Sequence, residues 1–240
     1  MPKAKKSRPA RPLQWILIAL GVLLLAPPVE VLLVRFIDPP RTRPMVLHQI
    51  GGVFSRGARP PLLYRWVDLP RVPETFLKHV WISEDQRFFQ HDGFDWKEID
   101  IAIERAEARG RPVRGASTIT MQCARSIFLW QGRSWIRKGI EAYYTFWMET
   151  LLSKRRIMEL YVNVIEVGRG VYGIEAGAQH YFGVSAMRLT REQSAILAAV
   201  LPNPKGWNPA RPGVALRNRQ RRILYREQQA AFPRHLLRSD

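Results

Sequence analysis

The stretch DWKEIDIAIERAEARG, residues 95–110, indicates how this chain folds, because it carries the signals for both ends of a helix. Asp95 with Glu98 three residues later is the pattern of a capping box, which begins many helices. The apolar residues that follow at helical spacing are Ile99, Ala102, Ile103 and Ala106. Gly110 then ends the pattern, so we predict a helix over this stretch.

Similar helix signals recur through the rest of the chain from about residue 73. Ser153 is placed to cap a helix, and Thr190 with Gln193 forms a second capping-box pattern before an Ala/Leu-rich run. The further predicted helices cover residues 117–130, 135–152, 153–163 and 195–201. Alternating strand patterns are nearly absent, so we expect the globular part to be mainly α.

The composition narrows the class of protein. The 240 residues carry 38 Lys+Arg against 20 Asp+Glu, a net charge of +18, and 46% of them are hydrophobic. This apolar content excludes a disordered polybasic chain. The single cysteine, Cys123, excludes an intramolecular disulfide and a multi-cysteine zinc site. The positive charge favours an anionic partner: nucleic acid, a phospholipid surface or a phosphorylated substrate.

The N-terminal region predicts a membrane anchor. Residues 1–11 carry five positive charges, and no charged residue occurs over 12–29. We predict a transmembrane helix over 12–34 with the N-terminus inside, which argues against a nucleic-acid partner for the rest. A cleaved signal peptide is the alternative, but no A-x-A-like site follows the apolar run. The expected division is a basic cytoplasmic segment 1–11, the anchor 12–34, a linker 35–64, a globular domain 65–228 and a basic tail 229–240. Two interpretations of the residues after about 210 stay open: a helix docked on the domain, or a free tail.

Acidic and aromatic residues alternate with a histidine in SEDQRFFQHDG, residues 83–93. A carboxylate beside aromatic surface can act as a general base or acid because burial raises its pKa. The alternative is that Glu84 and Asp85 are surface acids paired with Arg87. The loop also offers metal-ligand donors, although such loops more often cap helices: His91, Asp92 and Asp95.

Three further motifs each have an ordinary explanation. In GASTITMQ, residues 115–122, the glycine allows close approach of the backbone and the helix start can bind an oxyanion, but an N-cap explains it equally. Arg137 and Glu141, four residues apart, share a helix face and could form a surface salt bridge. Residues 154–163 form an amphipathic helix pattern that Asn163 would end.

Together and in this order, these motifs resemble those of the peptidoglycan glycosyltransferases, the transglycosylase module of bifunctional penicillin-binding proteins. The matching residues are Glu84, Asp85, Arg87, Phe88, His91 and Gly93; Gly115, Ser117, Thr118 and Ile119; Arg137, Lys138 and Glu141; Lys154, Ile157, Glu159, Tyr161 and Asn163; and Gly173, Ile174, Glu175, Ala176, Tyr181, Phe182 and Gly183. The resemblance covers about residues 65–225. With no room after it for a transpeptidase domain, the chain is similar to the monofunctional biosynthetic form.

The resemblance implies a mainly α, lysozyme-like two-lobed glycosyltransferase domain on one N-terminal transmembrane helix. It implies polymerisation of lipid II into β-1,4-linked glycan with inversion, release of undecaprenyl pyrophosphate, and no transpeptidase activity. The implied location is the inner (cytoplasmic) membrane, single-pass, with the catalytic domain in the periplasm. The implied partners are lipid II, the growing glycan strand, the membrane, and cell-division or elongation proteins.

The resemblance also assigns residue roles. Glu84 would be the general base that removes the proton from the acceptor 4-hydroxyl. Glu141 would lie near the donor pyrophosphate, directly or through a divalent cation (Mg²⁺ or Mn²⁺), although no cofactor is strictly required. Preorganised cations stabilise the charge that develops on a departing pyrophosphate. The predicted substrate-binding residues are Ser117, Thr118, Gln122, Arg125, Arg133, Arg137, Lys138 and Asn163.

This sequence departs from the family pattern at three positions: Met121 replaces a usual Gln, Arg125 a usual Lys and Gly177 a usual Ala. Met121 cannot donate the hydrogen bonds of an amide. The apolar run over 127–130 resembles a flap that enters the membrane, with a core segment as the alternative. Two rival functions remain: a lytic, lysozyme-like enzyme, and a membrane-anchored binding or scaffold protein without turnover.

Overall fold

The computed structural model describes residues 11–53, 60–110, 115–132 and 134–237. These residues are mainly helical, as the sequence predicted. The helices are α1 (Arg11–Phe36), α2 (Arg43–Val53), α3 (Glu74–Glu84), α4 (Trp96–Arg109), α5 (Ile119–Phe128), α6 (Trp135–Leu151), α7 (Lys154–Val164), α8 (Ile174–Phe182), α9 (Arg191–Val200) and α10 (Val214–Gln229). Short 3-10 helices are η1 (Leu69–Arg71), η2 (Phe88–Gln90), η3 (Ala186–Arg188) and η4 (Arg234–Leu237).

A small sheet joins distant parts of the chain. Its strands are β1 (Leu63–Tyr64), β2 (Glu166–Gly168) and β3 (Val171–Tyr172), in the order β1-β3-β2. β1 pairs parallel to β3, and β2 pairs antiparallel to it. The sequence analysis did not predict these strands, because a strand of two or three residues is too short to form an alternating pattern.

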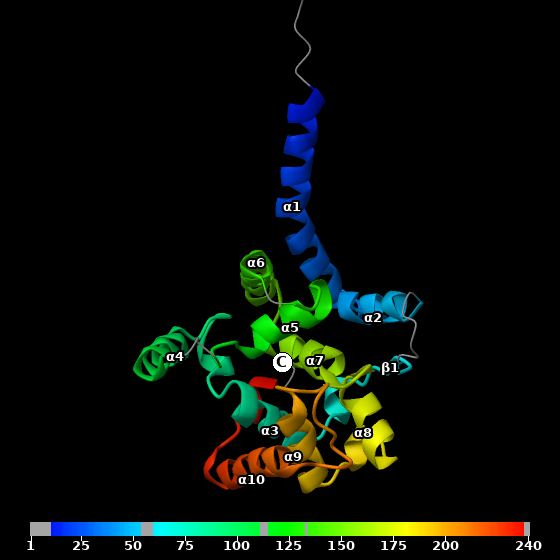
Figure 1. The fold of residues 1–240 in the computed structure, drawn as a ribbon, viewed down its shortest axis with the longest axis vertical. Coiled ribbons are helices and arrows are strands. Elements are labelled where there is room, and N and C mark those ends of the chain that lie inside the picture. The colour runs from blue at the N-terminus through cyan, green and yellow to red at the C-terminus, as the bar shows by residue number, and fades with distance from the viewer. Residues whose placement is uncertain (1–10, 54–59, 111–114, 133, 238–240) are drawn as a thin grey trace, which may run out of the picture.

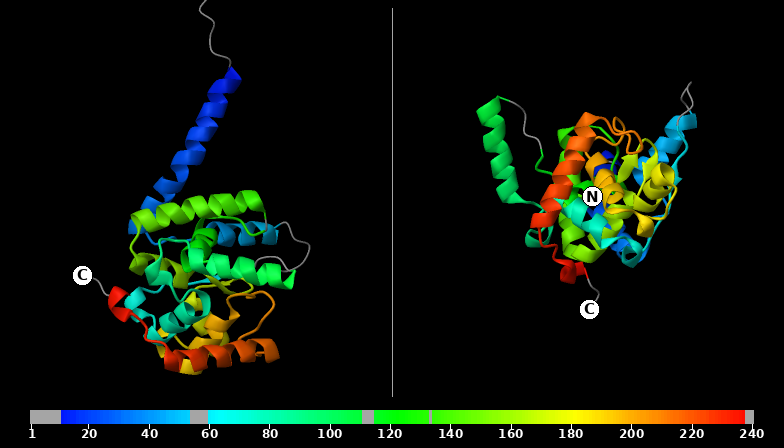
Figure 2. Two further views of the ribbon diagram at one scale, coloured as in Figure 1. Left: turned by 90° about the vertical axis from the view of Figure 1, so that its left-hand side faces the viewer. Right: turned by 90° about the horizontal axis from the view of Figure 1, so that it is seen from below.

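The helices form two groups below the long helix α1 (Figure 1). α2, α5 and α6 lie nearest to α1, whereas α3, α8, α9 and α10 lie at the far end, with α7 between the groups. α4 stands to one side of the body, which Figure 2 shows from below. The main contacts join α5 to α6 and α7, and α9 to α3 and α10. α7, which contacts both α5 and α8, therefore connects the two groups.

The predicted helix caps are confirmed. The Asp95 side chain accepts a hydrogen bond from the Glu98 backbone N–H, and Gly110 ends α4 in the left-handed region with a φ of 56°. Thr190 and Gln193 form a full capping box at the start of α9. Ser153 caps α7, which continues one residue past the expected stop at Asn163. Local side-chain chemistry thus sets the helix starts.

The helix α1 is long and apolar enough to cross a bilayer over Leu13–Phe36, with a mean hydropathy of 2.5. It is packed against the domain, and α2 lies inside the segment expected to be a linker. The Tyr143 hydroxyl donates to the Leu24 carbonyl at 2.8 Å, and the Tyr144 hydroxyl donates to Glu30 at 2.6 Å. Arg43 also pairs with Glu30, at 2.5 Å. These bonds hold the C-terminal half of α1 on α6 and α2.

The expectation of an exposed apolar flap over 127–130 is wrong for the first three residues. Ile127, Phe128 and Leu129 are buried, and only Trp130 is partly exposed, at 42%. Phe128 stacks on Tyr144 with ring centroids 4.5 Å apart, so the end of α5 belongs to the core. Exposed apolar side chains instead lie on α6, next to α1: Trp135, Ile136 and Phe146.

Candidate active site

Glu84 is the last residue of α3 and lies inside the protein. Its side chain is only 9% exposed. One carboxylate oxygen accepts from Arg219 Nη2 at 2.8 Å, and the other accepts from Gln122 Nε2 at 3.1 Å. Arg87 pairs with Asp95 at 2.8 Å, so the alternative of a surface acid paired with Arg87 is wrong.

The environment of Glu84 suits a proton acceptor. Burial raises the pKa of its carboxyl, and the Arg219 guanidinium and the Gln122 amide oppose this rise. The Tyr161 hydroxyl donates to Gln122 Oε1 at 3.0 Å, which turns the amide N–H₂ toward Glu84. Burial also raises the pKa of Tyr161 well above its ordinary value, so this phenol stays neutral and keeps donating. A carboxylate with a raised pKa is a stronger base.

Glu84 opens into a pocket of about 240 Å³ that includes two of the predicted substrate-binding residues, Ser117 and Thr118. Ser117 is partly exposed there. Thr118 is buried and caps α5, because its hydroxyl accepts from the Met121 N–H at 3.2 Å and donates to the Gly93 carbonyl at 2.7 Å. Ser117 can therefore meet a ligand, while Thr118 shapes the wall.

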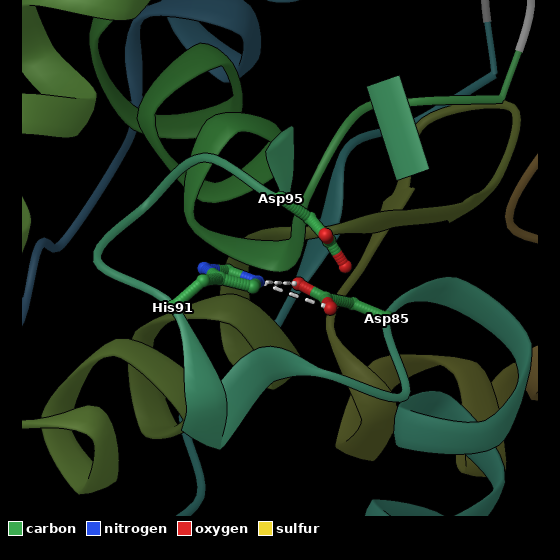
Figure 3. Close-up of side chains that lie close together, drawn as sticks. All are labelled: Asp85, His91 and Asp95. Atoms are coloured by element: carbon green, nitrogen blue, oxygen red, sulfur yellow. Dashed lines mark hydrogen bonds and ion pairs between the residues drawn. The ribbon is translucent and has the colours of Figure 1, made fainter. Parts of the chain in front are cut away.

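The acids and the histidine that follow Glu84 form a cluster (Figure 3). Asp85, His91 and Asp95 have ligand-type atoms within 4.8 Å of one another. Asp85 replaces Asp92, which is exposed, in the predicted metal set. Asp85 accepts from His91 Nε2 at 3.1 Å and from the Ile119 N–H at 3.0 Å.

Hydrogen bonds within the protein account for this cluster. The Gly93 N–H donates to His91 Nδ1 at 3.2 Å, which places the imidazole proton on Nε2, facing Asp85. Asp95 accepts from Arg87 and caps α4. The cluster therefore joins the loop after α3 to the first turn of α5.

Glu141 is the second predicted catalytic residue, and its side chain is 0% exposed. Arg137 Nη1 lies 2.5 Å from one carboxylate oxygen, and Lys138 Nζ lies 2.6 Å from the other. Arg125 Nη1 is 4.0 Å away. The alternative of a surface salt bridge is therefore wrong, because this is a buried carboxylate among three cations.

A second pocket, of about 520 Å³, lies beside Arg125 and Arg137, two of the cations around Glu141. Arg125 and Arg137 line it together with Lys205 and Glu166. Lys205 Nζ is 3.6 Å from a Glu166 oxygen, so Glu166 neutralises part of the charge. The two arginines leave the pocket suited to an anion.

Helix α5 connects the two pockets. Gln122 contacts Glu84, and Arg125, three residues later on the same side of the helix, faces Glu141. Contacts made through α5 thereby link six of the predicted residues: Glu84, Gln122, Arg125, Arg137, Lys138 and Glu141.

One predicted residue, Asn163, stands apart, and Arg133 lies outside the described residues. Asn163 is fully buried, and its amide bonds to the backbone N–H and carbonyl of Val67, at 2.9 and 2.8 Å. This geometry favours a structural role over the predicted substrate contact. Met121 is also buried, so its departure from the family pattern falls in the core and outside both pockets.

The sequence reasoning missed the contribution of α10. Arg219 reaches Glu84, and Arg226 lines the same pocket. The two arginines are seven residues apart and so share one helix face. That spacing was a usable signal, but α10 has several other arginines, and nothing local indicates which of them face the site.

Comparison with known proteins agrees with this geometry. A family model described as Transglycosylase matches residues 59–228. The chain is 45% identical over 214 residues to a biosynthetic peptidoglycan transglycosylase of Caulobacter vibrioides, covering 89% of this chain and 90% of that protein. It is 42% identical over 236 residues to one of Xanthomonas campestris pv. campestris (97% and 96% covered), and 42% identical over 210 residues to one of Pseudomonas aeruginosa (88% and 90%). The chain therefore belongs to the transglycosylase family, among the biosynthetic peptidoglycan transglycosylases, and has that family's lysozyme-like fold.

Proposed function

We propose that this peptidoglycan glycosyltransferase polymerises lipid II into β-1,4-linked glycan strands and releases undecaprenyl pyrophosphate. The observation that carries the proposal is the arrangement along α5: a buried carboxylate base beside Gln122, and, one turn later, a carboxylate among cations beside Arg125. A transfer between two phosphate-linked sugars needs both a base for the acceptor and positive charge for the leaving group.

Glu84 acts as the general base. Its carboxylate takes the proton of the acceptor 4-hydroxyl as that oxygen forms the new bond to the donor anomeric carbon, with inversion. Gln122 and Arg219 each hold one carboxylate oxygen, which fixes the orientation of the base. Oε1 also accepts from the Ser83 hydroxyl at 3.4 Å, whereas Oε2 accepts from Gln122 alone and has a further lone pair for the hydroxyl proton.

The cations around Glu141 stabilise the pyrophosphate. The bond from the anomeric carbon to the phosphate oxygen breaks, and the electron pair leaves with the pyrophosphate. Arg125 and Arg137 line the pocket where this charge would collect. Glu141 holds the neighbouring cations Arg137 and Lys138 in place through ion pairs. Both Glu141 oxygens are thus engaged by cations, so the protein supplies positive charge here through its own side chains.

The same proposal places the domain at a membrane surface. α1 is long and apolar enough to span the bilayer, and the exposed Trp135, Ile136 and Phe146 lie on the helix packed against it. We place α1 in the inner membrane as a single-pass anchor with the domain in the periplasm. Lipid-linked donor and acceptor then reach the site from the bilayer. We expect the matched transglycosylase domain to make glycan and to form no cross-links.

The test is polymerisation of labelled lipid II by the detergent-solubilised full chain. Wild type is expected to make long glycan, and Glu84→Gln to lose about 10²- to 10⁴-fold of the rate, the usual contribution of a general base. Glu141→Gln is expected to lose about 10²- to 10³-fold, because the cations lose their fixed positions. Glu192→Gln, an exposed glutamate on α9, is the matched control and should keep the wild-type rate.

The rival functions give different results in the same assay. A lytic enzyme would shorten glycan supplied to it and make none from lipid II. A scaffold protein would bind lipid II without turnover in wild type and variants alike. Either result would overturn the proposal.

A further inference from the structure

The helix α10 brings a cation to the proposed base from the far end of the chain. Arg219 Nη2 lies 2.8 Å from Glu84 Oε1 and 3.2 Å from the Ser83 carbonyl. The arginine side chain is 24% exposed, so solvent only partly screens the pair. Arg219 therefore contacts both the base and the last turn of the helix that carries it.

Three further contacts fix α10 against α3, α9 and the residues just after α3. His79 Nε2 lies 3.0 Å from Glu227 Oε2, and Arg191 of α9 donates to the same oxygen at 2.7 Å. One residue before Glu227, Arg226 donates to Gln86 at 2.8 Å. α10 cannot slide along α3 without breaking the hydrogen bonds of Arg191 and Arg226 and separating His79 from Glu227. The position of Arg219 is thus set by the packing of three helices.

The other charged groups near Glu84 are already committed elsewhere. Asp85 is turned to His91 and to the start of α5, and Arg87 is paired with Asp95. On the other elements facing Glu84, α5 presents the neutral Gln122 and α7 the neutral Tyr161. The other charged side chains that line the pocket of Glu84 are Glu98, which is paired with Arg105, and Arg226, which is hydrogen-bonded to Gln86. Among the residues that the structure describes, Arg219 is thus the cation paired with Glu84.

We infer that Arg219 is a positioning residue of the transfer reaction: it keeps Glu84 ionised and fixes one of its oxygens, so that the other can face the acceptor hydroxyl. The inference rests on the proposed role of Glu84 as base. A buried carboxylate without a partner takes up a proton, and a protonated carboxyl cannot accept another. The guanidinium opposes that protonation through a charge-assisted hydrogen bond, which is stronger than a neutral one.

The test is the pH dependence of kcat/KM for lipid II in wild type, Arg219→Gln and Arg219→Lys. The acid limb of the wild-type profile reports ionisation of the free enzyme's base. Without the positive charge, the limb should move to higher pH by about one unit, which is about a tenfold loss of rate on the limb. The rate should recover toward wild type at higher pH. Arg219→Lys should keep the limb near its wild-type position.

The controls separate positioning from folding. Arg222→Gln removes an exposed arginine of the same helix and should leave the profile unchanged. Thermal unfolding shows whether each variant is folded, and Arg219→Met, which keeps the apolar stem without the charge, replaces Arg219→Gln if that variant does not fold. A uniform loss at every pH with an unmoved limb, or no change at all, would overturn the inference.

Failure of the proposed function looks different. If wild type does not polymerise lipid II, the proposed function is wrong. If Glu84→Gln keeps the acid limb, the base is misassigned. If Glu84→Gln abolishes activity while the limb of Arg219→Gln stays in place, the base is correct and only the role of Arg219 is wrong.

Discussion

Replacing Asn163 by alanine should destabilise the protein without disabling the chemistry. The Asn163 amide satisfies the N–H and the carbonyl of Val67 and also donates to the Glu159 carbonyl at 2.9 Å. Alanine leaves both Val67 groups buried without a partner, and each such group costs about 1–3 kcal/mol. Taking a total of about 3 kcal/mol and about 2–4 °C per kcal/mol for a chain of this size, the midpoint should fall by about 6–12 °C.

The assay is thermal unfolding of the detergent-solubilised chain, with polymerisation rates measured well below both midpoints. Asn218→Ala, an exposed asparagine on α10, is the matched control and should stay within about 0.5 kcal/mol of wild type. We expect the rate of Asn163→Ala to remain within severalfold of wild type. An unchanged midpoint together with a raised KM for lipid II would refute this reasoning and restore Asn163 as a substrate contact.

Three other substitutions test the fold and the site. Burial raises the pKa of Glu84 above its ordinary value of 4.5, so ionising this group opposes folding. As pH rises above 4.5, the free energy of unfolding of wild type should therefore fall relative to that of Glu84→Gln. Denaturant titrations check this, and parallel pH curves for the two proteins would contradict it. Met121→Gln should lose about 1–3 kcal/mol in the same titrations and gain no polymerisation rate, because it buries an amide in the core; a faster enzyme would show that residue 121 does reach the substrate. Gly173→Ala should lose at least about 2 kcal/mol, since its φ is +80° and a Cβ there would lie 2.4 Å from the Asn163 carbonyl oxygen; a midpoint equal to wild type would exclude that steric argument.

The helices of the globular part could be predicted from local chemistry. Asp95, Thr190 and Ser153 cap the helices where the sequence places the caps. The three short strands and α2 gave too little periodicity to be recognised. The apolar run at 127–130 was ambiguous for a different reason, because a segment beside a membrane and a segment inside a core have the same composition. Only the packing of Phe128 on Tyr144 decides between them.

The site was predictable where its residues lie in motifs and unpredictable where they come from elsewhere in the chain. The partners of Glu141 lie within four residues of it on one helix, apart from Arg125. The cation paired with Glu84 is 135 residues away, on a helix whose sequence indicates only a basic segment. Which arginine of α10 meets the base depends on the register of α10 against α3, and register follows from packing over the whole domain.

The bonds from Tyr143, Tyr144 and Arg43 to α1 have a consequence for how the enzyme meets its substrate. With α1 in the bilayer, these bonds fix the domain rigidly to the membrane helix, so that the height and tilt of the two pockets relative to the lipid surface stay constant. Such an enzyme cannot swing out to capture substrate. Encounters must then come from sliding of lipid-linked molecules within the plane, so turnover at low substrate depends on membrane fluidity and surface density, and each new strand leaves at the same distance from the bilayer.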